Sequence, residues 1–362
     1  MNRNVLMENT SRRLVSLQCL RGIAALMVVV HHVLHQTPGF LSVWTTNAWQ
    51  AGVDLFFVIS GFVMVYVTNN RERSPVRFLA MRAARIVPIY WFYTLAAAGL
   101  ILILPSLFRS NEASIKHVAL SMLFVPHETR DHDLSPLVKQ GWTLNYEVFF
   151  YLLFALAMWI SFRRRISVSV TTLVVFAGIG MWIRLTGTSI GVAGFYFQDI
   201  ILEFAFGMLI AHAFVSGKLD SIPRLIGGIA VLTGFVSIFA LDSYATTARS
   251  LAYGLPAAII IIGALAVEAN ISALRMPFLQ FVGDSSYSIY LVHIFPIAVL
   301  RAMWPRLGLP MHGVAGLALF LLTSVTLVVA LGAISYYTIE RKSLRWLRVA
   351  IERRGRDDDA AN

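Results

Sequence analysis

The sequence has few charged residues and a single cysteine. Asp, Glu, Lys and Arg make up 14% of the 362 residues, whereas soluble domains usually carry about 25%. The chain therefore has too little charge to cover a water-soluble globule. The one cysteine, Cys19, excludes an intramolecular disulfide framework and a zinc site built from several cysteines. Hydrophobic residues make up 57% of the chain, which is typical of an integral membrane protein.

The net charge of +11 arises from 30 Lys and Arg against 19 Asp and Glu. A basic soluble protein would suggest a nucleic-acid partner, but basic residues on so apolar a chain are expected at a membrane surface. We therefore expect contacts with membrane lipids and no nucleic-acid partner.

Long apolar runs recur along the sequence. A membrane-spanning helix needs about 20 mainly apolar residues, and these runs are too long and continuous for barrel strands. The sequence predicts an all-α integral membrane protein with about ten transmembrane helices. They are placed at 14–35, 51–68, 86–107, 142–162, 166–185, 195–215, 224–241, 251–268, 278–301 and 313–338. The first run carries an arginine and three histidines and lacks a small-residue cleavage pattern, so we expect it to persist as a span.

The distribution of Lys and Arg predicts the orientation. Most of the 30 basic residues fall on alternate connections, including 71–85, 163–165 and the basic tail 341–362. The positive-inside rule then places both termini in the cytoplasm. We see no linker or repeat, so residues 1–362 are expected to form a single transmembrane domain. The outer segment 108–141 is expected to hold a short interfacial helix near 115–125, and its polar loop 127–133 lacks metal-ligand spacing, so no metal is expected.

Four ionisable residues are predicted to reach one level near the outer face. They are His32, Asp54, Glu147 and His293, each on a different span. Ionisable groups inside a membrane are costly and often mark function, and a carboxylate beside an imidazole can orient a general base. The alternatives are that His32 hydrogen-bonds a neighbouring helix and that Asp54 is a carboxylate at a helix N-terminus.

Three arginines are predicted to gather toward the cytoplasmic side. Arg82 and Arg85 share one helical face, and Arg21 lies about 16 Å from His32 along the first span. Clustered guanidiniums bind phosphates, although a collar that holds lipid head groups is the alternative. Together with the outer base, the cluster suggests a donor with a phosphorylated nucleotide and a long arm, such as acetyl-CoA.

Five blocks in order resemble the acyltransferase-3 family of bacterial membrane O-acyltransferases. They are Arg21 with His32; Gly52 through Phe62; Arg82 with Arg85-Ile86-Val87-Pro88; Trp142 through Glu147 with Phe150-Tyr151; and Ser286 through His293. Within this family, the chain resembles the short form that lacks a periplasmic hydrolase domain, as in exopolysaccharide acetyltransferases of the rhizobial type. Thr143 stands where the family usually has serine, and the extra His31 leaves the base ambiguous, although the spacing to Arg21 favours His32.

The resemblance implies an inner-membrane enzyme that transfers acetyl from acetyl-CoA to a hydroxyl of a glycan or lipid-linked glycan. It implies that His32 and Arg21 form the essential pair. We expect His32 to act as base with Asp54 or Glu147, and Arg21, Arg82 and Arg85 to hold the donor. Substrate contacts are expected from Ser60, Trp142, Tyr290 and His293, with Ser60 serving helix packing rather than acting as a covalent nucleophile. The alternatives are a transporter or flippase of a glycan intermediate and a non-enzymatic partner in polysaccharide export.

Overall fold

The protein is helical throughout the part of the chain that the structure describes. The computed structural model describes residues 13–35, 46–69, 74–103, 114–129, 134–188, 190–274, 276–310 and 313–361, with side chains up to 353. No strand occurs within these ranges. The prediction of an all-α fold is confirmed for these residues.

Seven described helical stretches are long and apolar enough to cross a membrane. They are Val15–His35, Asn47–Thr68, Pro75–Ile103, Lys139–Ile160, Arg165–Thr186, Gly191–Val215 and Gly313–Arg353. Two further apolar helices, Arg224–Ala240 and Ser250–Ala266, are shorter, and one pair is bent. Each of the ten predicted spans thus overlaps apolar helix, although residues 104–107 of the predicted span 86–107 lie outside the described residues. Their number as complete crossings stays a prediction.

The helices that carry the site come from distant parts of the sequence. They are α1 (Val15–His35), α2 (Gly52–Thr68), α3 (Pro75–Ile103), α5 (Trp142–Ile160), α7 (Leu202–Val215) and α12 (Ser286–Val292). Around them lie α4 (Ile115–Met122), α6 (Arg165–Thr186), α8 (Arg224–Ala240), α9 (Leu255–Ala266), α10 (Glu268–Ala273), α11 (Pro277–Asp284), α13 (Ile294–Met303), α14 (Gly313–Ser335) and α15 (Arg341–Ala361). Helix α4 coincides with the short helix expected near 115–125.

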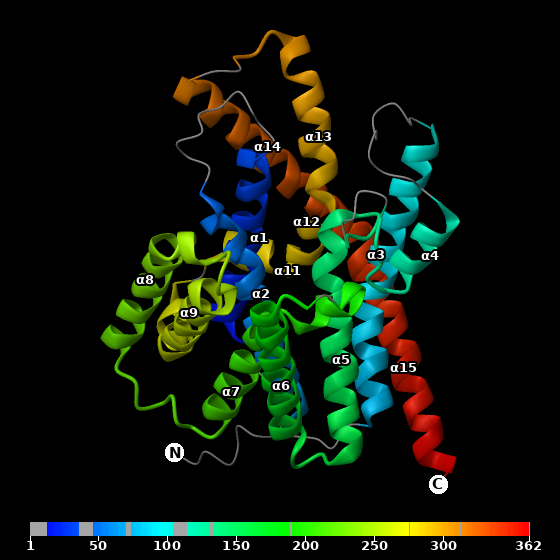
Figure 1. Ribbon diagram of the computed structural model, residues 1–362, viewed down its shortest axis with the longest axis vertical. Coiled ribbons are helices and arrows are strands. Elements are labelled where there is room, and N and C mark those ends of the chain that lie inside the picture. Colours follow the sequence, from blue (N-terminus) through cyan, green and yellow to red (C-terminus); the bar gives the residue numbers. More distant parts are fainter. Residues whose placement is uncertain are drawn as a thin grey trace.

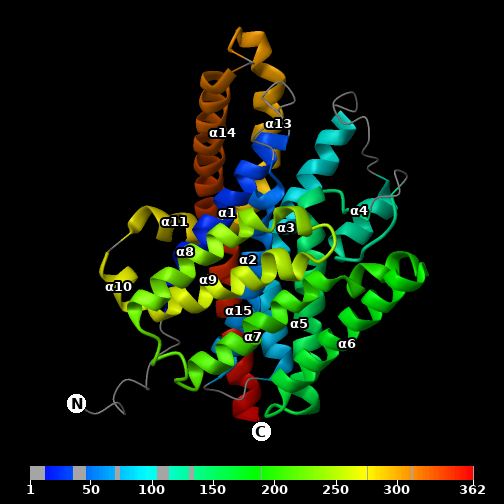
Figure 2. The same cartoon turned by 60° about the vertical axis from the view of Figure 1, so that its left-hand side comes forward.

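The two ends of the molecule carry different connections. The turn between α5 and α6 and the end of α15 lie at one end, and the far ends of α13 and α3 lie at the other (Figure 1). The view turned by 60° shows the same separation (Figure 2). The expected inner connection 163–165 and the tail therefore share one side, while the direction of that side in a membrane stays a prediction.

Two predicted spans differ from the sequence-based bounds. The predicted span 278–301 consists of α11, α12 and α13, and the last two meet at a 44° bend around His293. Pro296 explains the bend, because proline has no N–H to donate to the carbonyl of Val292 and its ring crowds that turn. The second difference is at the tail, where a π-helix over Tyr336–Glu340 joins α14 to α15 as one continuous stretch.

Two glycines let α2 and α7 cross with their backbones in contact. A Cβ added at Gly61 would lie 2.1 Å from the Phe204 carbonyl oxygen, and one at Gly207 would lie 1.9 Å from that of Val58. Small residues permit such close approach between membrane helices. The start of α1 is fixed as well, since the backbone N–H groups of Val15 and Ser16 each donate to the Glu268 carboxylate over 2.8 Å.

Candidate active site

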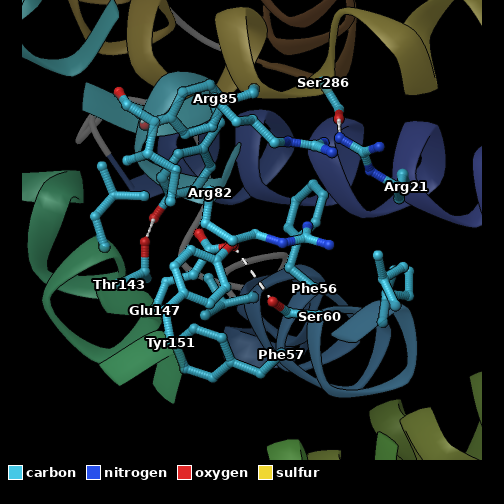
Figure 3. Close-up of a pocket in the computed structure, with 17 residues that line it drawn as sticks. Arg21, Phe56, Phe57, Ser60, Arg82, Arg85, Thr143, Glu147, Tyr151 and Ser286 are labelled. Carbon is cyan, nitrogen blue, oxygen red and sulfur yellow. Dashed lines mark hydrogen bonds between the residues drawn. The ribbon is translucent and has the colours of Figure 1, made fainter. Parts of the chain in front are cut away.

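One cavity brings together five of these helices. Its space amounts to about 770 Å³ when the part open to solvent is included. Its polar lining comes from α1, α2, α3, α5 and α12: Arg21, Ser60, Arg82, Arg85, Thr143, Glu147, Tyr151, Ser286, Tyr287 and Tyr290. Apolar side chains such as Phe56 and Phe57 complete the wall (Figure 3). The residues that line the cavity are therefore far apart in the sequence, from Arg21 to Tyr290.

The three predicted arginines all line this cavity. Arg21 Nη2 donates to Ser286 Oγ over 2.9 Å, and Arg85 points toward Arg21 from α3 (Figure 3). The guanidinium of Arg82 lies over the rings of Phe78 and Tyr151, 5.6 and 5.7 Å from their centroids. Three cations facing one partly enclosed space give it the charge that a phosphate-bearing ligand requires.

Glu147 lies among these arginines and not beside His32, so the predicted common level is wrong for this residue. Its Oε1 accepts hydrogen bonds from Ser60 Oγ at 3.3 Å and from Tyr151. The difference arises from how deep α5 begins relative to α12. Thr143, in the first turn of α5, already hydrogen-bonds Tyr290, and Glu147 follows one turn further along the helix. Glu147 is therefore the carboxylate of the cavity.

Tyr290 stands at one end of the cavity. Its phenol oxygen forms hydrogen bonds with Thr143 Oγ1 and with the Gln140 carbonyl, each at 2.9 Å. Tyr290 lines the cavity, and its ring lies 5.8 Å from the ring of His293. Two hydrogen bonds thus hold a residue that joins the arginine cavity to the histidines.

His32 and His293 form a contacting pair behind Tyr290. Their ring centroids are 4.7 Å apart with an edge-to-face geometry. His32 Nδ1 lies 3.0 Å from the Val28 carbonyl oxygen, and His293 Nδ1 lies 2.6 Å from that of Tyr290. Because a carbonyl oxygen can only accept, each Nδ1 is assigned the hydrogen and each Nε2 keeps its lone pair. The pair lies next to the cavity, although neither ring is part of its lining.

Asp54 has another partner than the predicted histidine. Its carboxylate is fully buried and accepts from Arg249 Nε at 2.9 Å and from Arg249 Nη2 at 2.8 Å. Gly52 packs against Ala24 and Val28, so α2 enters the molecule well below His32 on α1. The prediction that Asp54 lies level with His32 is wrong, and the residue forms a bidentate ion pair instead.

Other residues differ from expectation in smaller ways. Trp142 packs edge-on against Phe57 and Tyr146 and is not among the residues that line the cavity. Sequence reasoning missed Tyr151, the Asp54 partner Arg249, and Glu340, which lies at the end of an apolar run beside a basic tail. An acidic residue at such a boundary is a usable signal, since it would be expected to pair with nearby cations.

Comparisons with known proteins place the chain among acyltransferases. Residues 14–334 match a family profile described as an acyltransferase domain. The chain is 36% identical over 302 residues to the exopolysaccharide production protein ExoZ of Rhizobium meliloti, which covers 82% of this chain and 89% of that protein. It is 29% identical over 166 residues to the acyltransferase MdmB of Streptomyces mycarofaciens, which covers 43% of this chain and 41% of that protein. No solved structure matches it.

Proposed function

Since the chain belongs to the acyltransferase-3 family, we propose that it is an inner-membrane enzyme that transfers an acetyl group from acetyl-CoA to a hydroxyl of an exported glycan. An exopolysaccharide is the acceptor that the ExoZ similarity favours. The single observation that carries the proposal is the juxtaposition of three guanidiniums on one cavity with a histidine pair behind Tyr290.

The arginines account for the donor. Arg21, Arg82 and Arg85 would bind the phosphates of acetyl-CoA, and the thioester arm would extend past Tyr290 toward His32. Arg21 and His32 belong to one continuous helix and are separated by about 16 Å along its axis. A nucleotide with a long unbranched arm fits such a separation, whereas a compact acyl phosphate would leave the histidines out of reach.

The histidine pair accounts for the proton transfers. His32 Nε2 would take the proton of the acceptor hydroxyl while the oxygen attacks the thioester carbonyl. The new C–O bond forms, the C–S bond breaks, and the CoA thiolate takes the proton back from the imidazolium, which gives an ester and free CoA. The ring of His293 would hold His32 in position by packing against it. Asp54 would stabilise the fold through its ion pair with Arg249 and would take no part in the reaction. The proton transfers in this scheme use His32 and the CoA thiolate and do not require a metal ion.

Acetyl transfer in vitro tests the proposal. Purified protein in nanodiscs, supplied with acetyl-CoA and chemically de-O-acetylated exopolysaccharide, should release free thiol and acetylate the polysaccharide, as measured by mass spectrometry. His32→Ala should reduce turnover by about 10²–10⁴-fold, the usual contribution of a general base. His31→Ala is the comparison variant, because the His31 ring packs against both His32, at 5.2 Å, and His35, at 4.1 Å, and the spacing to Arg21 favours His32 rather than His31 as the base.

Two outcomes would overturn the proposal. Full activity in His32→Ala would remove His32 as the base. Movement of glycan across the membrane without consumption of acetyl-CoA would favour the transporter instead.

A further inference from the structure

Glu340 is a buried carboxylate behind the arginine cavity. It is the last residue of the π-helix Tyr336–Glu340 that joins α14 to α15, and it is 5% exposed. π-Helical turns are rare and often occur at functional sites. The turn is fixed next to α3, since Tyr93 of α3 donates to Ser335 Oγ over 2.8 Å just before the π-helix begins.

The carboxylate contacts α12 directly. Ser288 Oγ donates to Glu340 Oε2 over 2.6 Å, and Ser288 is fully buried. Helix α12 also carries Ser286, which accepts from Arg21, and Tyr287 and Tyr290, which line the cavity. The hydrogen bond from Ser288 therefore ties Glu340 to the helix that presents three residues of the cavity.

Glu340 also interacts electrostatically with the arginines. Its charge acts on both Arg21 and Arg85, whose own charges oppose one another. The two guanidiniums converge next to Ser286 (Figure 3). Like charges brought together away from water repel strongly unless a nearby opposite charge compensates them. Glu147 supplies part of that charge inside the cavity, and Glu340 adds to it from outside the lining, where it takes no space from an anion.

We propose that Glu340 is a positioning residue that holds Arg21 and Arg85 in the geometry that binds the phosphates of the donor. The inference rests on the proposed function, because it assumes a phosphate-bearing donor in this cavity. Glu340 acts through Ser288 and through its charge, and the donor does not contact it.

Donor binding to purified full-length protein in nanodiscs tests this role. The dissociation constant for CoA is measured by calorimetry, and KM for acetyl-CoA and kcat are measured with de-O-acetylated exopolysaccharide. Glu340→Gln keeps the shape and removes the charge. We expect Kd and KM to rise about 10–100-fold, the loss typical of a charge-assisted hydrogen bond, with kcat changed by less than about threefold. Glu340→Asp should recover part of the affinity.

The controls separate positioning from other roles. Glu352→Gln makes the same chemical change on α15 and should leave Kd unchanged. Tighter CoA binding by Glu340→Gln would show that the carboxylate merely opposes the anion and would overturn the proposal. Unchanged Kd with a lower melting temperature would show a structural role alone and would also overturn it.

Two further results are decisive. If Glu340→Gln fails to fold, Ser288→Ala decides, because a raised Kd supports the proposal and an unchanged Kd overturns it. If the wild-type protein itself does not bind CoA, the proposed function fails, and this inference fails with it for that separate reason.

Discussion

At the scale of single residues, Tyr290 links the cavity to the histidine pair. It lines the cavity, its ring lies 5.8 Å from that of His293, and its hydroxyl is held by Thr143 and the Gln140 carbonyl. Under the proposed function, an acyl group that approaches His32 from the arginines would meet this ring. The side chain at position 290 should therefore determine which acyl groups the enzyme accepts.

Tyr290→Ala should widen acyl specificity. Removal of the ring makes room for additional methylenes, each of which is worth about 1–3 kcal/mol of discrimination in an apolar pocket. We expect the ratio of kcat/KM for butyryl-CoA over acetyl-CoA to rise about tenfold or more. Tyr290→Phe keeps the ring and should leave the ratio near the wild-type value. An unchanged ratio in Tyr290→Ala would show that the ring does not limit the acyl group.

Asp54→Ala should reduce stability rather than catalysis. The substitution leaves the Arg249 guanidinium without its bidentate partner in a buried site. Breaking such a pair typically costs about 3–5 kcal/mol. The measurement is the free energy of unfolding in detergent, together with turnover per folded molecule. The double variant Asp54→Asn with Arg249→Gln should recover part of the loss. Normal stability with lost turnover would instead return Asp54 to the catalytic machinery.

Single residues were predictable where their chemistry depends on local spacing. Arg82 and Arg85 share a face because they are three residues apart, and the structure places both on the cavity. The partner of Asp54 was not predictable in this way. Arg249 lies 195 residues away, and a residue's depth in a bundle depends on where its helix enters, which local sequence does not set.

At the scale of elements, the crossing of α2 and α7 is the closest backbone contact that supports the site. Helix α2 carries Ser60 next to Gly61, so the crossing also fixes one wall of the cavity. The sequence predicted packing from the Ser60-Gly61 pair but not its partner helix. The bend at His293 was within reach of sequence reasoning, because Pro296 lies four residues after the carbonyl of Val292 that it leaves without a donor.

Gly207→Leu should destabilise the protein and reduce activity. Even its Cβ would lie 1.9 Å from the Val58 carbonyl oxygen, so the helices must separate. Overpacking of a tight interface typically lowers the free energy of unfolding by about 1–3 kcal/mol. We expect the upper end of this range here, because the helix backbones are already in contact. Gly99→Ala is the matched control, since nothing lies within 4 Å of its added Cβ. Thermal unfolding in detergent measures both variants, and equal melting temperatures would contradict the interpretation of this crossing.

At the scale of the whole molecule, the predicted inner connection 163–165 and the tail lie at one end, and labelling can test which way that end faces. Cys19 is 4% exposed, so it contributes little background. Lys116→Cys on α4 should react with a membrane-impermeant maleimide in intact spheroplasts. Arg353→Cys near the end of α15 should react only after permeabilisation, because both termini are predicted to be cytoplasmic. The reverse pattern would invert the orientation.

The expected convergence of four ionisable residues was correct in part at this scale. In the structure, His32 contacts His293, Glu147 lies with the arginines, and Asp54 forms an ion pair with Arg249. The length of the apolar runs predicted which segments are helices. It carries no information on how far each helix is displaced along its axis relative to its neighbours, and that displacement decides which charged side chains meet.

The hydrogen-bonded ring of Tyr290 also bears on the energetics of the cell. A bilayer protein that lines a polar recess with charged groups risks conducting ions, which would dissipate the electrochemical gradient that powers the cell. Tyr290, a residue of its lining, is held by two hydrogen bonds to its hydroxyl, and the ring of His293 lies next to it. Under the proposed function, this fixed ring would help to keep the barrier to protons intact while thioester and glycan meet from opposite compartments.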